Sequence, residues 1–125
     1  MDGASKFFVI ALIALVALFV WGRWLSARYE REHEITVDLT EDEVLKIVRK
    51  TFPAFFWGAA PGPGDLNKRF RSFSDNGATI SIDIEKREGQ LVVRTWLSDW
   101  ETRFAMVASP GANGALRLAR RLARA

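Results

Sequence analysis

The sequence predicts an α+β protein, in which one transmembrane helix at the amino end precedes a small antiparallel sheet covered by two helices. Three observations lead to this prediction. The residues Phe7–Val20 are apolar and uncharged throughout. Later segments alternate between apolar and polar residues and are separated by turn residues, as strands are. Amphipathic stretches on either side of these segments, near Thr40 and near Ala115, predict the covering helices.

The apolar run continues through Trp21 to Leu25 with no acidic residue. A helix needs about 20 residues to cross the hydrocarbon core of a bilayer, and Phe7–Leu25 has that length. The alternative is a cleaved signal peptide, whose apolar part is shorter, about 7–15 residues. A cleavage site before Arg28 would also place Leu25 where a small residue belongs. We therefore interpret the run as a membrane anchor.

The carboxyl end of this run is typical of a membrane–water interface. Tryptophan rings lie at the level of the headgroups, and arginine side chains extend toward them. We expect this role for Trp21, Arg23, Trp24 and Arg28. Arg31 adds to the positive charge on this side, whereas the amino side has only Lys6 and the terminal amine. The positive-inside rule therefore favours a cytoplasmic carboxyl domain.

Beyond the anchor, the chain divides into a short charged stretch and a folded domain. We place the amino tail and transmembrane helix at residues 1–27, a charged juxtamembrane collar at 28–34, and the soluble α+β domain at 35–125. The residues Ala27–Glu34 are rich in charge, and we expect them to continue the helix out of the bilayer. The residues His33–Leu39 alternate, with Ile35, Val37 and Leu39 on one face, which predicts a strand.

A helix is expected to begin after Thr40. Thr40 and Glu43 have the spacing of a capping box, in which each side chain accepts a hydrogen bond from the backbone N–H of the other. Acidic residues follow Thr40 and basic residues come near Lys50, as the helix dipole favours. Pro53 ends the helix. The apolar stripe of this helix is Val44, Leu45, Val48 and Phe52.

Turn residues divide the next part of the chain into strands. The short apolar segment Ala54–Trp57 is read as a strand, and Gly58–Gly64 as a plain loop because of its prolines and glycines. Further strands are expected at Leu66–Phe73, Ala78–Glu85 and Leu91–Leu97, with turns at Asp75–Gly77 and Lys86–Gly89. In the second of these strands Ile80, Ile82 and Ile84 are expected to face the core, and Ser81, Asp83 and Glu85 the solvent.

The segment Ser98–Met106 is open to two interpretations. It either begins a helix with a second capping box or forms a strand with a bulge, and we favour the strand. The final segment is a clear amphipathic helix that follows the break at Ser109–Gly111. Its apolar face is Ala115, Leu118, Ala119 and Leu122, and its opposite face is Arg117, Arg120, Arg121 and Arg124.

The expected order β-α-β(3–5)-α resembles the TATA-binding-protein-like and helix-grip arrangements, in topology only. A sequence resemblance is carried by Thr95–Phe104, together with Leu66–Arg69 and Ile80–Asp83. These stretches are similar to uncharacterised actinobacterial single-pass membrane proteins. The resemblance implies a bacterial cytoplasmic (inner) membrane and no particular chemistry.

Residues that carry common chemistry are sparse. His33 is the single histidine, and the chain has no cysteine. The Gly58–Gly64 loop lacks the Lys and Ser/Thr of a phosphate-binding loop. Asp83 and Glu85 project from one strand face, but a cation site needs more oxygen ligands than two. We therefore expect no catalytic residue, no metal and no cofactor.

Two sets of residues are candidates for contact with a partner. The first is a possible core cluster or apolar pocket, formed by Trp57, Trp96, Trp100 and Phe104. The second is basic and suits an acidic surface, either anionic lipid or a partner protein. It comprises Lys68, Arg69, Arg71, Arg117, Arg120, Arg121 and Arg124.

These features favour a non-catalytic, membrane-anchored interaction module, an accessory or scaffold subunit of a membrane protein complex. The alternative is a tethered domain that binds a lipid or another apolar ligand between its sheet and helices. The expected partners are the membrane and other membrane proteins. The formal net charge of +3 is too small to indicate nucleic acid as a partner.

Overall fold

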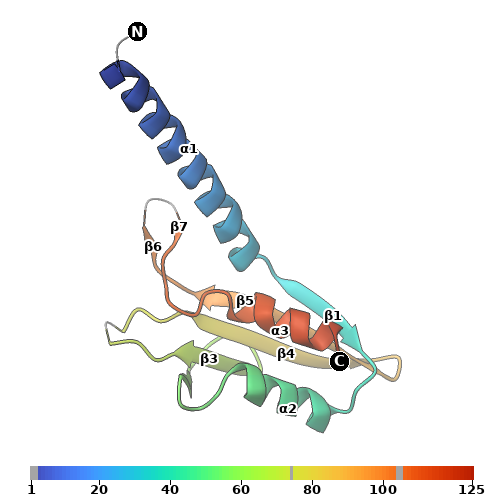
Figure 1. The fold of residues 1–125 in the computed structure, drawn as a ribbon. Helices are drawn as coiled ribbons and strands as arrows, with labels where there is room; N and C mark the ends of the chain where they lie inside the picture. Colours follow the sequence, from blue (N-terminus) through green and yellow to red (C-terminus); the bar gives the residue numbers. More distant parts are fainter. Residues whose placement is uncertain (1–2, 74, 104–105) are drawn as a thin grey trace.

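The computed structural model of the chain describes residues 3–73, 75–103 and 106–125 (Figure 1). A long helix, α1 (Gly3–Glu30), stands away from the rest of the molecule over most of its length. The following elements are β1 (His33–Val37), α2 (Glu41–Thr51), β2 (Trp57–Ala59), β3 (Leu66–Phe70), β4 (Thr79–Arg87), β5 (Gln90–Asp99), β6 (Thr102–Arg103), β7 (Met106–Val107) and α3 (Gly114–Ala123). The predicted α+β class with an amino-terminal apolar helix is confirmed.

Five strands form one antiparallel sheet in the order β1-β5-β4-β3-β2. The long β4–β5 hairpin is its centre, and β1 and β2 are its two edges. Val93 of β5 lies opposite Ile35 of β1 on one side and Ile84 of β4 on the other. Side chains of paired residues point to the same face of a sheet, so an apolar row crosses these three strands.

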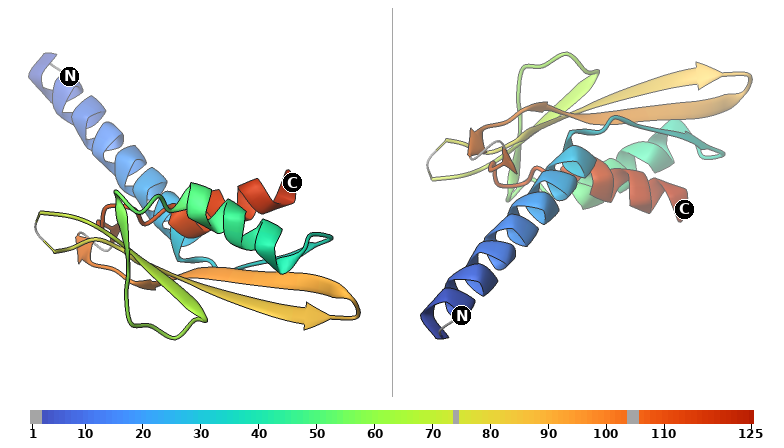
Figure 2. Two further views of the ribbon diagram at one scale, coloured as in Figure 1. Left: turned by 90° about the horizontal axis from the view of Figure 1, so that it is seen from below. Right: turned by 90° about the horizontal axis from the view of Figure 1, so that it is seen from above.

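Helices α2 and α3 lie together on one face of the sheet and leave the other face open (Figure 2). The isoleucines Ile80 and Ile82 of β4 are fully buried beneath them, as expected, and Ile84 packs at the edge of the same core. Helix α3 contributes its predicted apolar face, whereas in α2 Ile47 rather than the expected Leu45 packs against the core beside Val44, Val48 and Phe52. The buried residues of the two helices include Val44, Val48, Ala115, Leu118, Ala119 and Leu122, none more than 5 % exposed.

The capping box at the start of α2 is confirmed. The backbone N–H of Glu43 donates to the Thr40 hydroxyl at 3.2 Å, and the N–H of Thr40 donates to the Glu43 carboxylate at 3.3 Å. The first turn of α2 is acidic and its last turn basic, as the helix dipole favours.

The strand expected at Ala54–Trp57 forms at Trp57–Ala59 instead. The carbonyl of Pro53 accepts the N–H groups of the third and fourth residues after it, which bends the chain into a turn before β2 begins. The expected Gly58–Gly64 loop therefore starts two residues late, because its first residues pair with β3. Its prolines, which lack an N–H group, come only after that pairing.

The central strands are longer than expected, and β3 is shorter. Strands β4 and β5 stay paired up to a two-residue turn, Glu88–Gly89, in which both residues have positive φ angles of 51° and 82°. Such a turn matches the twist of the two strands and lets their pairing continue to its edge. At the other end, β3 stops at Phe70 rather than Phe73.

The segment Ser98–Met106 is neither a helix nor one continuous strand. β5 ends at Asp99, and β6 and β7 form a separate small hairpin in which Thr102 pairs with Val107. The base of this hairpin is closed by Glu101, whose N–H donates to the Ser109 hydroxyl at 2.6 Å and whose carbonyl accepts the N–H of Ala108. Phe104 lies outside the described residues.

Candidate interaction surfaces

Helix α1 is long and apolar enough to cross a membrane by length and composition, a test that a signal sequence also passes. Its apolar side chains project away from the protein, as the exposed fractions of 67 % for Ile10 and 64 % for Leu15 show. Trp21 and Trp24, near its carboxyl end, are also more than half exposed. The guanidinium of Arg28 lies over the ring of Trp24, 4.9 Å from its centre.

The carboxyl end of α1 is packed against the domain rather than joined to it by a free linker. Ser26 is buried, and its hydroxyl accepts the backbone N–H of Val107 at 2.9 Å. Gly22 faces Met106 so closely that a side chain at this position would collide with the Met106 sulfur. Tyr29, one turn after Leu25, packs against the hydrophobic core. Helix α1 and the domain therefore share an interface.

A second apolar surface lies on the domain itself. Three phenylalanines near the β2 edge project into solvent, with exposed fractions of 83 % for Phe55, 52 % for Phe56 and 113 % for Phe73. Phe55 and Phe56 meet edge to face, with ring centres 4.9 Å apart. We refer to these three residues and the adjacent Arg71 as the aromatic–basic patch.

The residues of the aromatic–basic patch line a hollow of about 400 Å³, together with Phe70 and Ser72. The backbone N–H of Arg71 donates to the Phe56 carbonyl at 2.8 Å, which joins the two chain segments that form the hollow. The exposed Arg71 guanidinium lies near Gly58 and forms no ion pair with a described carboxylate. The hollow continues into a groove of about 540 Å³ along β2 and the end of β3.

The structure separates the tryptophans that the sequence analysis grouped together. Trp57 is in the core, 3 % exposed, where its ring meets Phe52 and Phe70 edge to face at 4.8 and 5.3 Å. Trp96 is half-buried on the open face of the sheet, with the Arg94 guanidinium 5.9 Å from its ring centre. Trp100 is 37 % exposed at the end of β5. They line no common pocket.

The seven candidate basic residues do not form one surface. Arg69 alternates with Phe70, which packs into the core, so Arg69 points away from the face that α3 covers. It forms an exposed ion pair with Asp75 at 3.4 Å. Arg117 is half-buried and donates to the Thr51 carbonyl at the end of α2 at 3.0 Å. On α3 the exposed arginines are Arg120, Arg121 and Arg124.

The open face of the sheet carries a buried polar network that the sequence analysis missed. Ser81 was expected to face solvent, yet it is fully buried. Its hydroxyl is within 2.6 Å of the Asn67 side-chain oxygen and 2.7 Å of the Ser98 hydroxyl. Asn67 bonds in turn to both backbone groups of Gly64 at 3.0 Å, so the glycine-rich loop covers the part of this face around Ser81.

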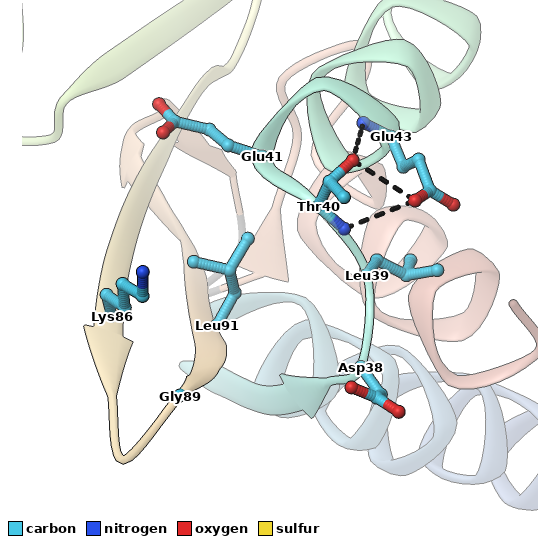
Figure 3. A pocket seen from close by; sticks show the side chains of 8 residues that line it. All are labelled: Asp38, Leu39, Thr40, Glu41, Glu43, Lys86, Gly89 and Leu91. Atoms are coloured by element: carbon cyan, nitrogen blue, oxygen red, sulfur yellow. Dashed lines mark hydrogen bonds between the residues drawn. The ribbon is translucent and has the colours of Figure 1, made fainter.

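A further hollow, of about 430 Å³, lies at the end of the domain remote from α1 (Figure 3). Leu91 and Lys86 line it from the β4–β5 hairpin, and Leu39 and Glu41 line it from the segment that leads into α2. The nearby Glu43 carboxylate is occupied by the capping box of α2. The rim therefore carries separate charges of both signs, and its charged groups do not converge on one point as the ligands of a binding site would.

Groups suited to catalysis or metal binding are not gathered at any of these surfaces. Burial and the nearby Arg31 lower the pKa of His33, so its neutral form is favoured in the folded protein. Asp83 accepts the backbone N–H of Asp65 at 2.8 Å and so holds the loop that precedes β3. Among the described residues, no three His, Cys, Asp or Glu side chains come together as a metal site requires.

No known protein family matches the chain, and comparisons with curated proteins and with solved structures also find no match. The surfaces themselves are therefore the basis for assigning a function.

Proposed function

We propose that this chain is a single-pass membrane protein, in which α1 anchors a non-catalytic interaction domain at the bilayer surface. Its role would be that of an accessory or scaffold subunit of a membrane protein complex, with the domain on the cytoplasmic side of a bacterial inner membrane. The uncovered apolar surface of α1 supports the anchor, and Arg23, Arg28 and Arg31 at its carboxyl end support the orientation.

The observation that carries the proposed interaction function is the aromatic–basic patch. Burying one phenylalanine side chain is worth about 1.5–3 kcal/mol, and contiguous exposed apolar groups on a folded domain mark interaction sites. The three phenylalanines of the patch lie on the domain, outside the apolar span of α1, and we propose that a partner buries them.

The chemistry of the patch indicates a protein partner. Its centre is hollow rather than convex, which suits inserted side chains better than a flat bilayer surface. The guanidinium of Arg71, which forms no ion pair with a described carboxylate, can donate two parallel hydrogen bonds to a carboxylate of a partner. We therefore propose that the patch receives an apolar segment bearing an Asp or Glu from a membrane protein that lies beside the anchor.

The alternative of an apolar ligand between sheet and helices finds no support in the packing. The side chains that meet there, Ile80, Ile82, Val44 and Leu118, are fully buried against one another. The resemblance of the expected order β-α-β(3–5)-α to the TATA-binding-protein-like and helix-grip topologies remains a proposal.

Photo-crosslinking in intact membranes tests the proposed partner. With p-benzoylphenylalanine in place of Phe73, we expect a discrete adduct with a second membrane protein, and no such adduct from the same probe at Gln90, at the far end of the domain. Arg71→Glu should abolish the adduct by repelling the partner carboxylate, whereas Arg120→Glu on α3 should preserve it. Crosslinks to lipid alone, or an adduct indifferent to Arg71→Glu, would contradict the proposal.

A further inference from the structure

The β6–β7 hairpin lies beside the carboxyl-terminal part of α1, which adjoins the domain. In Figure 1 it projects from the sheet in the same direction as the amino-terminal part of that helix. The contacts are specific: Met106 packs on Gly22, and Val107 is hydrogen-bonded to Ser26. The hairpin is thus in contact with two successive turns of α1.

These contacts give the depth of the hairpin relative to the anchor. Gly22 and Ser26 are separated by about 6 Å along the helix axis at the usual rise per residue. Because Met106 lies at the level of Gly22, β7 reaches as deep as the Trp21–Trp24 segment of α1. Tryptophans at the end of an apolar span mark the interfacial layer of a bilayer, where rings and headgroups meet.

Backbone groups of the described part of the hairpin are paired within the protein. Such pairing suits the inner edge of the interfacial layer, because unsatisfied N–H and C=O groups become costly toward the hydrocarbon core. Thr102 pairs with Val107, and Arg103 with Met106, inside the hairpin. The Val107 N–H bonds to a side chain of α1, and the N–H of Ala108 bonds to Glu101. Ser26 is the one buried residue among those described in α1, and its hydroxyl thus accepts a hydrogen bond from the backbone of the hairpin.

We infer that the β6–β7 hairpin is a second membrane contact, which lies in the interfacial layer of the bilayer beside α1. The inference rests on the proposed anchor and adds a consequence to it. With α1 and the hairpin both in the bilayer, the domain is held in one orientation instead of rotating about a single tether. The aromatic–basic patch would then be presented in a constant direction to a neighbouring membrane protein.

Depth-dependent fluorescence quenching tests this inference on the full chain in phospholipid vesicles. The protein has no cysteine, so single cysteines can carry an environment-sensitive dye without further substitutions. We would label Thr102→Cys on the hairpin, Ala27→Cys on α1 as an interface reference, and Gln90→Cys at the far end of the sheet. All three positions are exposed in the fold. Lipids with a nitroxide at a shallow acyl position should quench the dyes at 102 and 27, and not the dye at 90.

The three positions distinguish failure of the inference from failure of the anchor. A dye that is quenched at residue 27 but not at 102 would overturn the hairpin contact and leave the anchor standing. Loss of quenching at both positions would mean that α1 is not in the bilayer, so the proposed function and the inference would fail together.

A matched pair of variants tests whether the contact with α1 holds the hairpin at its depth in the bilayer. Gly22→Leu introduces a side chain where Met106 packs and should displace the hairpin, so that quenching at residue 102 is lost while quenching at 27 persists. Ala27→Leu, at an exposed position of α1, introduces the same leucine side chain away from the Gly22–Met106 contact, and quenching at 102 should be retained. If the hairpin dye is quenched equally in both variants, the Gly22–Met106 contact does not hold the hairpin in the bilayer.

Discussion

Arg117 differs from the other arginines of α3 although all four occupy the polar side of an amphipathic pattern. Its guanidinium donates to the carbonyl of Thr51, at the last residue of α2. A helix end leaves carbonyl groups without intrahelical partners, and a basic side chain also interacts favourably with the negative end of the helix dipole. One member of the expected binding face thus joins the two helices of the domain.

We predict that Arg117→Gln lowers the free energy of unfolding by about 1 kcal/mol, because a half-exposed charged hydrogen bond is lost. Arg121→Gln, at an exposed position on the same helix, should change it by less than about 0.5 kcal/mol. Urea denaturation of the full chain in detergent, followed by circular dichroism, measures both. Equal effects of the two substitutions would mean that the bond to Thr51 adds nothing to stability.

Individual aromatic residues were the least predictable from sequence. Trp57 and the adjacent Phe56 are similar in type, yet one is 3 % exposed and the other 52 %. The difference arises from the turn at Pro53, which shifts β2 and thereby decides which ring points to the core. No local periodicity covers so short a segment, so the aromatic–basic patch could not be anticipated, although an apolar FF pair before a tryptophan was visible in the sequence.

At the scale of whole elements, periodicity was a sound guide wherever an element was long. Helices α2 and α3, with the β4–β5 hairpin, follow from regular spacing of apolar residues over several turns or pairs. The β6–β7 hairpin has only two residues per strand, and its position depends on contacts with α1, which are distant in the sequence. Such short elements are defined by tertiary contacts, and these contacts cannot be predicted from the local sequence.

The open face of the sheet shows the same limit of local patterns. Alternation correctly places Ser81 opposite the isoleucines, but it does not reveal that the glycine-rich loop covers that face. The loop is fixed there by the Asn67 side chain, which bonds to both backbone groups of Gly64 and lies next to the Ser81 hydroxyl.

We predict that Ser81→Ala destabilises the fold by about 1 kcal/mol, because it removes a buried hydroxyl whose neighbours Asn67 and Ser98 keep their other bonds. Thr36→Ala, at an exposed position of β1, should cost only a few tenths of a kcal/mol. The same urea titration reports both values. If Ser81→Ala proves neutral, the hydroxyl network does not help to hold the loop against the sheet.

For the whole molecule, the decisive feature is that α1 and the domain share an interface. The helix continues to Glu30, and β1 begins only at His33. With so short a connection and with Ser26 and Tyr29 packed against the domain, the direction of α1 and that of the sheet are linked. The far end of the β4–β5 hairpin points away from the amino end of α1 (Figure 1), so it should report which side of the membrane the domain occupies.

We predict that the domain lies in the cytoplasm, because Arg23, Arg28 and Arg31 lie at or beyond the carboxyl end of the apolar span, whereas only Lys6 and the terminal amine precede it. Gln90→Cys, beside the Glu88–Gly89 turn, should react with a membrane-impermeant maleimide only after the cells are permeabilised. Ala4→Cys, on the short amino tail, should react in intact cells and serves as the matched control. The two positions lie on opposite sides of the apolar span, so the correct orientation gives one reactive and one protected cysteine. The reverse pattern would place the domain outside the cytoplasm. The partner segment proposed to bind the aromatic–basic patch would then also lie outside.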